Sequence, residues 1–577
     1  MRCAVDLGLR AACLAAAVLI AGCTSRGFSV QTAGAQVLMG YAEKNAAQSD
    51  RFAELAKAQP AAPAKTEAKS AAPLDGFVDP LTRSGDRIPI TLESCIRRAL
   101  ANNLGIQIAR YGPPIAHTSV REAEAMFDPS WFLNNALSRV KQKAGSFFLG
   151  ANVLMARQWD FSTGLEALIP TGATVSLSQD WTWIQSNSAF ILPNPQYASA
   201  VRLSASQPLL RGGGVEVTTS PIVLARLDEK ISVADFKTSV MNTILDVEAS
   251  YWQLVLAETQ VQAIIEAMEA AKENLRIVRL RFQEGKDKRV VVSLAESAVT
   301  SRQADLVSAR LRLAQTSDRL KRLINDPELP FDQPGVLAAT ELPMAAPLPV
   351  GLPMLRQSMQ AALQNRPEMQ QADLRITQAG VRERVARNAE LPQLDLAASY
   401  GFTGLDPDVD RAINEQFETR YYDWSVGLDL SIPIGNRARV AAHERSQLNQ
   451  AVALKDREDT RQKILLEVSE AVRNLAAAEE AVQARRAARQ AAEQTLHDGQ
   501  AFVSAGAALL KDLLDVQRDL ADAKVREMEA MASYMVGLAA LQRAMGTLLE
   551  YNDIHVVDDY TAAPRVPRAA AAPAPAK

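Results

Sequence analysis

The sequence predicts a mainly helical chain with a membrane β-barrel part, built from a duplicated unit of helix, strands, long helix and return helix. Three observations support this fold class. Residues 437–503 contain no proline and almost no glycine, which favours one helix about 100 Å long at about 1.5 Å per residue. Just before it, residues 424–432 alternate apolar with small or polar side chains, the period of a strand with one wet face. The same order of elements occurs twice along the chain.

Residues 1–22 are predicted to be a secretory leader. Two arginines precede an apolar run, residues 11–20, that is too short to span a bilayer. The four residues ending at Cys23, Ile-Ala-Gly-Cys, resemble the bacterial lipobox, which implies cleavage before Cys23, lipidation of its sulfur and acylation of the new amino terminus. The residue after this cysteine is Thr24 and not an aspartate, which resembles the lipoproteins that are sorted to the outer membrane. The alternative is an ordinary signal peptide followed by a chance cysteine.

Both ends of the mature chain have the composition of linkers. Residues 23–88 and the tail 551–577 are rich in alanine and proline, so they are predicted to stay extended and to carry no chemistry. Of the four cysteines, two lie in the leader and Cys23 ends it, which leaves Cys95 alone. The sequence therefore predicts no internal disulfide in the mature chain.

Between these ends the chain contains two copies of one unit, residues 89–345 and 346–550. Each copy begins with an amphipathic helix, passes a proline into strand-like sequence, and continues into a long helix, a glycine and a return helix. The matching segments are residues 92–103 with 355–366, 127–131 with 390–394, and 207–214 with 432–437.

The long helices carry the apolar spacing of a coiled coil. Along the first of them, apolar residues recur three and four positions apart, and charged residues fill most of the other positions. We interpret the apolar stripe as a packing seam and the charged positions as a solvated face. The seam residues are Val261, Ile265, Met268, Leu275, Val278 and Phe282.

The strands raise the question of oligomeric state. No segment after the leader has the roughly 20 uncharged apolar residues of a membrane helix. About four strands per chain cannot close a barrel alone, because an open edge in lipid leaves backbone groups unpaired. If the strands enter a membrane, several chains must share one barrel, and the protein is an oligomer.

The two copies differ in the length of the strand region. About 38 residues separate Leu394 from Ile432, enough for two strands and a loop, whereas roughly twice as many separate Trp131 from Gln207. The extra length contains another alternating segment, residues 174–183, and tryptophans suited to a bilayer interface, Trp159, Trp181 and Trp183. The alternative is a soluble hairpin at the cell surface. The sequence leaves open whether this region widens the barrel or forms a surface loop.

Four motifs follow one another along the chain: Asn102-Asn103, residues 207–213, residues 365–368 and Leu513-Leu514-Asp515-Val516-Gln517. Taken together and in this order, they resemble the motifs of the TolC-type outer-membrane efflux family, and the resemblance covers residues 90–550. The resemblance implies a homotrimer in which each protomer lends four strands to a twelve-stranded β-barrel, mounted on a long α-helical coiled-coil barrel in the periplasm. Such a protein is a passive exit duct of an efflux or type I secretion system, joined by a periplasmic adaptor (membrane fusion protein) to an inner-membrane pump of RND or ABC type. No cofactor is implied.

The resemblance also implies where the functional residues lie. It places Gly285 and Gly506 at helix-turn tips that meet the adaptor, and Asp515 in an acidic ring at the closed periplasmic aperture. Asp512 and Asp519 stand three and four residues from Asp515, so all three share a helix face. The alternative is that these acids pair with Lys511 and Arg518 on a solvated surface. Arg518 also occupies the position of a second ring acid in the family, and the first tip, residues 285–289, is basic and lacks a matching aspartate.

Other function classes have less support. Acidic and basic residues nearly cancel, 66 against 63, which gives no indication of nucleic-acid binding. An enzyme is not expected, because the four histidines are scattered without metal-ligand spacing and residues 212–214 lack the Gly-Lys-Ser/Thr of a phosphate loop. The remaining alternatives are a periplasmic adaptor or a structural helical lipoprotein without a channel. The transported substrate is not encoded in any recognisable pattern.

Overall fold

The computed structural model describes residues 87–143, 153–285, 288–330, 335–344, 352–504 and 510–556. These residues belong to one compact unit, Asp75–Val556. The predicted leader, Cys23, Gly506 and all of the two predicted linkers except residues 87–88 and 551–556 lie outside the described residues.

The elements follow the predicted order twice. The first copy contains β1 (Ile88–Ile90), α3 (Leu92–Asn102), α4 (Leu104–Arg110), α5 (Gly112–Glu124), η2 (Ala125–Phe127), β2 (Ser130–Lys143), β3 (Val153–Leu168), β4 (Thr174–Ser186), β5 (Gln196–Pro208), α6 (Val215–Thr218), α7 (Ser220–Gln283), α8 (Arg289–Ile324) and β6 (Leu337–Ala339). The second contains α9 (Leu352–Asn365), α10 (Pro367–Ala389), β7 (Gln393–Asp406), α11 (Val409–Phe417), β8 (Tyr422–Ser431), α12 (Arg437–Ser504), α13 (Leu510–Met545) and α14 (Leu548–Tyr551).

Local sequence explains how each copy begins. Thr91 caps α3, its hydroxyl oxygen accepting from the backbone nitrogen of Ser94 at 3.2 Å. Asn103 ends α3 and caps α4, its side-chain oxygen accepting from the nitrogen of Ile106 at 3.1 Å. In the second copy Pro367 opens α10, because a proline in the first turn gives up no helical hydrogen bond. The Asn-rich starts of the two copies are therefore helix junctions.

One antiparallel sheet contains six strands in the order β2-β3-β4-β5-β7-β8. The resemblance predicted four strands per protomer, and this number is corrected to six. The two additional strands come from the longer strand region of the first copy, where the alternation of apolar and polar residues continues through 153–186. A second, two-stranded parallel sheet joins β1 to β6.

The sheet is amphipathic: most side chains on one face are apolar, and most on the other face are polar or small. Residues that are paired across neighbouring strands have their side chains on the same face of the sheet. The register of the strands therefore shows on which face each side chain lies. The apolar face carries Trp131, Leu133, Leu137, Trp159, Phe161, Trp181, Trp183, Leu203, Tyr400, Phe402, Trp424, Val426, Leu428 and Leu430. The polar face carries Asn134, Ser138, Asp160, Ser162, Ser176, Asp180, Thr182, Arg202, Ser204, Ser399, Asp423, Ser425 and Asp429.

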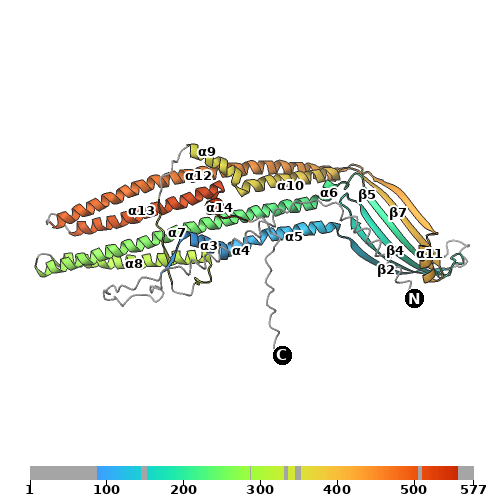
Figure 1. Cartoon of the computed structure of the whole chain (residues 1–577), viewed down its shortest axis with the longest axis horizontal. Coiled ribbons are helices and arrows are strands. Elements are labelled where there is room, and N and C mark those ends of the chain that lie inside the picture. Colours follow the sequence, from blue (N-terminus) through green and yellow to red (C-terminus); the bar gives the residue numbers. More distant parts are fainter. Residues whose placement is uncertain are drawn as a thin grey trace, which may run out of the picture. The chain divides into compact units, whose positions relative to one another are not determined.

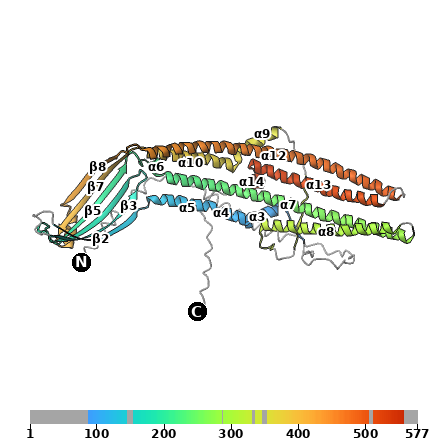
Figure 2. The same cartoon turned by 180° about the vertical axis from the view of Figure 1, so that it is seen from behind.

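Two helical hairpins, α7 with α8 and α12 with α13, extend from the sheet, and α13 also packs on α7 (Figures 1 and 2). At about 1.5 Å per residue the 64 residues of α7 and the 68 of α12 are each on the order of 100 Å long, as the sequence predicts. Among the described residues, no helix combines the length and hydropathy that crossing a bilayer takes.

The core follows the helices in two clusters. One surrounds α7 and includes Cys95, Val247, Tyr251 and Leu320, and the other lies between α12 and α13 around Leu475. Of the predicted seam, Val261 and Val278 are buried, and Ile265 and Met268 pack against the first cluster, whereas Phe282 near the tip is exposed. The second return helix, α13, ends at Met545, because Gly546 takes a left-handed backbone with φ of +77°.

Candidate functional site

The sheet is joined to the helices by two glycine turns. Between β5 and α6, Gly212 and Gly214 have φ of +78° and +98°, and Gly435 before α12 has φ of +89°. The Gly212 nitrogen donates to the Asn388 side-chain oxygen at 2.7 Å, and the Asn436 side chain donates to the Glu390 carbonyl at 2.9 Å. Residues 212–214 therefore form a turn, and the hydrogen bond from Gly212 to Asn388 joins the first copy to the second at this strand–helix junction.

α11 covers part of the apolar face. Its side chains at Val409, Ala412 and Ile413 face the sheet, and Gln416 exchanges hydrogen bonds of 3.0 and 3.2 Å with Gln179. A cavity of about 320 Å³ remains beneath the helix. The lining includes Trp159, Phe161, Trp181, Trp183 and Tyr197, so the three tryptophans singled out in the sequence lie together on the apolar face.

The first helix tip contains Gly285, as predicted. This residue follows α7 with φ of +74°, its nitrogen donates to the Phe282 carbonyl at 3.0 Å, and a Cβ at this position would meet no atom within 4 Å. A left-handed residue ends the helix and turns the chain toward α8. The second tip, with Gly506, lies outside the described residues.

The three candidate aperture acids lie near the start of α13. Asp512, Asp515 and Asp519 are exposed in the protomer, and Leu513 between them is buried. Arg518 lies 4.0 Å from Asp522, one turn farther along. Within the described part of the chain, none of the three acids forms an ion pair, so the alternative pairing of these acids with Arg518 is not found.

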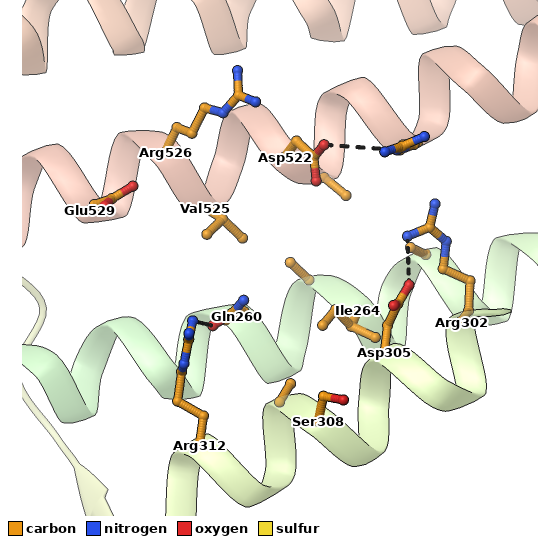
Figure 3. A pocket seen from close by; sticks show the side chains of 15 residues that line it. Gln260, Ile264, Arg302, Asp305, Ser308, Arg312, Asp522, Val525, Arg526 and Glu529 are labelled. Atoms are coloured by element: carbon orange, nitrogen blue, oxygen red, sulfur yellow. Dashed lines mark hydrogen bonds and ion pairs between the residues drawn. The ribbon is translucent and has the colours of Figure 1, made fainter. Parts of the chain in front are cut away.

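A polar cleft of about 600 Å³ lies between α13 and the hairpin of α7 and α8 (Figure 3). We call it the helical cleft. Asp305 lies 3.2 Å from Arg302, and Arg312 donates to the Gln260 side-chain oxygen at 3.4 Å. Asp519 and Asp515 precede Asp522 by three and seven residues, so the α13 face that lines the cleft continues toward the tip into these acids. Its charged lining residues are Arg302, Asp305, Arg312, Arg518, Asp522, Arg526 and Glu529.

Two polar contacts join the hairpins beside the cleft. Asn274 of α7, buried at 6 % exposure, donates to the Gln517 side-chain oxygen at 3.0 Å. Lys524 of α13 lies 3.0 Å from Glu266 of α7, and this hydrogen bond lowers the pKa of the Glu266 carboxyl. The sequence alone predicts neither contact. Only the apolar positions of the seam indicate which residues pack, and a buried amide follows no recognisable sequence pattern.

A buried ionic network holds the start of the second copy. Arg366 is 4 % exposed, contacts Glu467 of α12, and lies 2.8 Å from Glu368. Arg543 of α13 lies 3.2 Å from Glu467. Burial is the largest single influence and raises the pKa of the Glu368 carboxyl, but the hydrogen bond to Arg366 and the positive charges of Arg366 and Arg543 together outweigh it and hold that pKa below its ordinary value. The Asn-Arg-Pro-Glu motif thus joins three helices, a role that its sequence alone does not reveal.

Histidine–carboxylate pairs occur beside the junction in both copies. His443 of α12 lies 2.9 Å from Glu383 and 3.0 Å from Glu390, and the hydrogen bond to Glu383 is the main reason that the pKa of the imidazole is raised. In the first copy, His117 of α5 lies 2.9 Å from Glu229 of α7. Among the described residues, no group of three or more His, Cys, Asp or Glu side chains is arranged to hold a metal ion.

Known proteins share both the sequence pattern and the fold. The pyoverdine export outer membrane protein OpmQ of Pseudomonas putida is 24% identical over 348 residues, 60% of this chain and 69% of the relative. The outer membrane protein TolC of Vibrio cholerae is 23% identical over 350 residues, 59% of this chain and 76% of the relative. Among solved structures, CusC superposes with a TM-score of 0.60 at 18% identity over 84% of this chain and 99% of that one. The CmeC outer membrane channel of Campylobacter jejuni superposes with a TM-score of 0.59 at 18% identity, over 84% and 94%.

The sequence also matches the family of outer membrane efflux proteins in two segments, residues 96–326 and 358–547, which together make up well over half of the chain. One segment falls in each of the two copies described above. This chain belongs to the outer membrane efflux protein family.

Proposed function

We propose that this chain is the outer-membrane channel of a tripartite efflux or type I secretion system. It is a passive exit duct for substrates handed over by an inner-membrane pump through a periplasmic adaptor. The observation that carries the proposal is an amphipathic sheet joined at one end directly to two long helical hairpins. An apolar face suits lipid and a polar face suits a water-filled lumen, while the hairpins extend the duct across the periplasm.

The open sheet requires partners. Among the described residues, no strand pairs with the outer edges of β2 and β8, and backbone groups at such edges cannot stay unpaired in lipid. A homotrimer in which β8 of one protomer pairs with β2 of the next removes every edge. The sheet then lies in the outer membrane, the helices lie in the periplasm, and lipidation at Cys23 supplies a second membrane attachment.

The periplasmic end supplies the gate and the docking surface. Three copies of the acidic stripe Asp512, Asp515 and Asp519 around a trimer axis place like charges close together, which favours cations at the aperture. The tips at Gly285 and Gly506 meet the adaptor. The duct performs no catalytic step, binds no cofactor, and leaves the choice of substrate to its pump, of RND or ABC type.

The first test is the native mass of the mature protein, extracted in mild detergent from a separated outer-membrane fraction. We expect a mass of three chains and ion conductance after insertion into a planar bilayer. A monomer without conductance would contradict the channel and favour a structural helical lipoprotein.

The aperture is tested in the same bilayers. Asp515→Ala is expected to lower the preference for cations over anions, because it removes one charge from each protomer at the narrow end. Asp459→Ala is the matched control, since this acid lies on α12, 2.6 Å from Lys463, and outside the stripe. If both variants show the same preference for cations over anions, Asp515 does not line the aperture.

A further inference from the structure

We propose that the hairpin β3–β4 is part of the channel wall, so that three protomers with six strands each close an eighteen-stranded barrel instead of a twelve-stranded one. This inference rests on the proposed function and specifies the size of the duct at the membrane. It follows from the height, the side-chain chemistry and the edges of the sheet.

The hairpin spans the full height of the sheet. Strand β4 pairs with β3 from Thr174 to Ser186 and with β5 from Thr174 to Ile184, without a gap in either register. A hairpin that only capped the cell-surface end would leave β2 and β5 side by side along the rest of their length. In this chain β2 and β5 are instead separated by two complete strands.

The turn between β3 and β4 is docked at the strand–helix junction. The Thr171 carbonyl accepts from the Gly214 nitrogen at 3.1 Å and from the Gln207 side-chain nitrogen at 3.1 Å. Gly172, with φ of +92°, lies so close that a Cβ there would be 2.7 Å from the Gly212 carbonyl oxygen. The hairpin therefore returns to the level at which the other strands meet the helices, which a surface loop does not reach.

The hairpin also has the chemistry of a wall. On the polar face Asp160 accepts from the Thr182 hydroxyl at 2.9 Å and from the Gln158 side chain at 2.9 Å, and Ser178 donates to Asp180 at 3.1 Å. These acids lie at mid-strand, where only a water-filled lumen solvates them. On the opposite face, the rings of Trp159, Phe161 and Trp181 form a continuous row, with centroids 6.3 and 5.3 Å apart. These rings line the cavity beneath α11, so on this face the hairpin carries a continuous apolar surface that the helix partly covers.

The sheet edges permit closure with all six strands. β2 leaves the helical end of the sheet and β8 returns to it, so neighbouring copies would pair these edges antiparallel, as an even number of strands requires. Both edges expose apolar side chains, with Leu137 of β2 at 78 % and Trp424 of β8 at 66 %. The partner that fits both edges is a second copy of this chain.

Two consequences follow for transport. Because barrel diameter grows roughly linearly with strand number, eighteen strands give about 1.5 times the diameter of twelve. The inserted strands also add Asp160, Glu166 and Asp180 to the lumen face of each protomer. The outer-membrane part of this duct is therefore wider and more acidic than four strands per protomer would make it.

Disulfide trapping in isolated outer membranes tests the wall. Two double variants, Asn134→Cys with Ser162→Cys and Ser176→Cys with Ser204→Cys, join β2 to β3 and β4 to β5 at side chains that touch at 3.4 and 3.0 Å. We expect both to form disulfides within one chain on mild oxidation. Native Cys95 should form no disulfide under these conditions, because it is fully buried and burial raises the pKa of its thiol to about 12.

Matched pairs make the result interpretable. Ser399→Cys with Ser425→Cys joins β7 to β8, whose hydroxyls lie 2.8 Å apart, and should form in any version of the barrel. Asn134→Cys with Ser204→Cys should not form, since β3 and β4 separate these residues. Disulfide formation in this last pair, without the first two, would overturn the wall hypothesis.

The strand count is then read directly from electron cryo-microscopy of the trimer in detergent. Eighteen strands per trimer are expected. A trimer with twelve strands would overturn the wider barrel and leave the channel function intact, whereas a detergent monomer would overturn the channel function itself. The two failures are thus distinguishable.

Discussion

At the scale of single residues, buried polar side chains join helices that lie far apart in the sequence. Arg366 shows why burial decides the importance of such a contact. Its guanidinium is shielded from water and is shared by Glu368 and Glu467, whereas Arg461 and Glu458, 3.0 Å apart on the surface of α12, are both nearly half exposed. A buried charge that loses its partner keeps its desolvation cost, and an exposed one is rehydrated.

We therefore expect Arg366→Ala to lower the free energy of unfolding by about 3 kcal/mol, because it leaves two carboxylates beside a buried cavity. Arg461→Ala, the matched control, should cost less than about 1 kcal/mol. Chemical unfolding followed by helical circular dichroism measures both. Equal losses would contradict the role of Arg366 as a buried link.

His443 gives the strand–helix junction a pH dependence. Its pKa is raised in the folded chain, so the protonated imidazole contributes stability that is fully present below the unfolded value of about 6.5 and is lost as the pH rises through the folded pKa. The melting temperature of the wild type should exceed that of His443→Gln at pH 5, and the difference should shrink toward pH 9. His497→Gln, an exposed position on the same helix, is the control. A difference that does not change with pH would contradict this assignment.

At the scale of elements, packing of the hairpins depends on a few polar positions inside an otherwise apolar seam. The amides of Asn274 and Gln517 pair only when α7 and α13 are in one register, so they exclude shifted alignments of the two helices. Apolar seam residues alone would tolerate a slip by a whole heptad.

Asn274→Leu is expected to destabilise the protein by about 1–3 kcal/mol, because the Gln517 amide loses its partner. The double variant Asn274→Leu with Gln517→Leu should recover most of this loss, since neither polar group is then left unpaired. Thermal unfolding of the two variants checks the prediction. If the double variant is less stable than the single one, the unpaired Gln517 amide is not the cause of the loss, and the prediction is wrong.

The β3–β4 hairpin depends on its turn in a similar way. Gly172→Ala should destabilise the sheet by about 1–2 kcal/mol, because the residue has a left-handed backbone and a Cβ would press on the Gly212 carbonyl. Gly427→Ala on β8, where a Cβ meets nothing within 4 Å, is the control and should be nearly neutral. The yield of heat-resistant trimer on gels compares the two variants, and equal yields would contradict docking of the turn.

At the scale of the whole molecule, the architecture follows from two surfaces that one chain cannot cover. The sheet has open edges, and Asp512, Asp515 and Asp519 near the start of α13 have no ion-pair partners among the described residues. Closure into a homotrimer satisfies the edges and gathers the acids around one axis. Function at this scale is therefore a property of the assembly, which is why the native mass is the first experiment.

The sequence predicted the elements well where the signal is local. The signals for α12 (Arg437–Ser504), for the prolines before β2 and β7 and for the turn glycines each act within a few residues. The structure places those that lie in the described residues as expected. The duplication was visible because both copies repeat these local signals in one order.

Sequence by itself thus determined the helices, the amphipathic strands, the two copies and, through its motifs, the family. Only the tertiary structure decided how many strands share one sheet, that the β3–β4 turn reaches the helices, and that Arg366, Asn274 and His443 bind residues on other elements. The physical reason is distance along the chain. The alternation of residues in a strand shows which side chains share a face, but it does not show which strand pairs with it. A buried polar pair produces no periodic sequence pattern, because its two residues lie from tens to hundreds of positions apart.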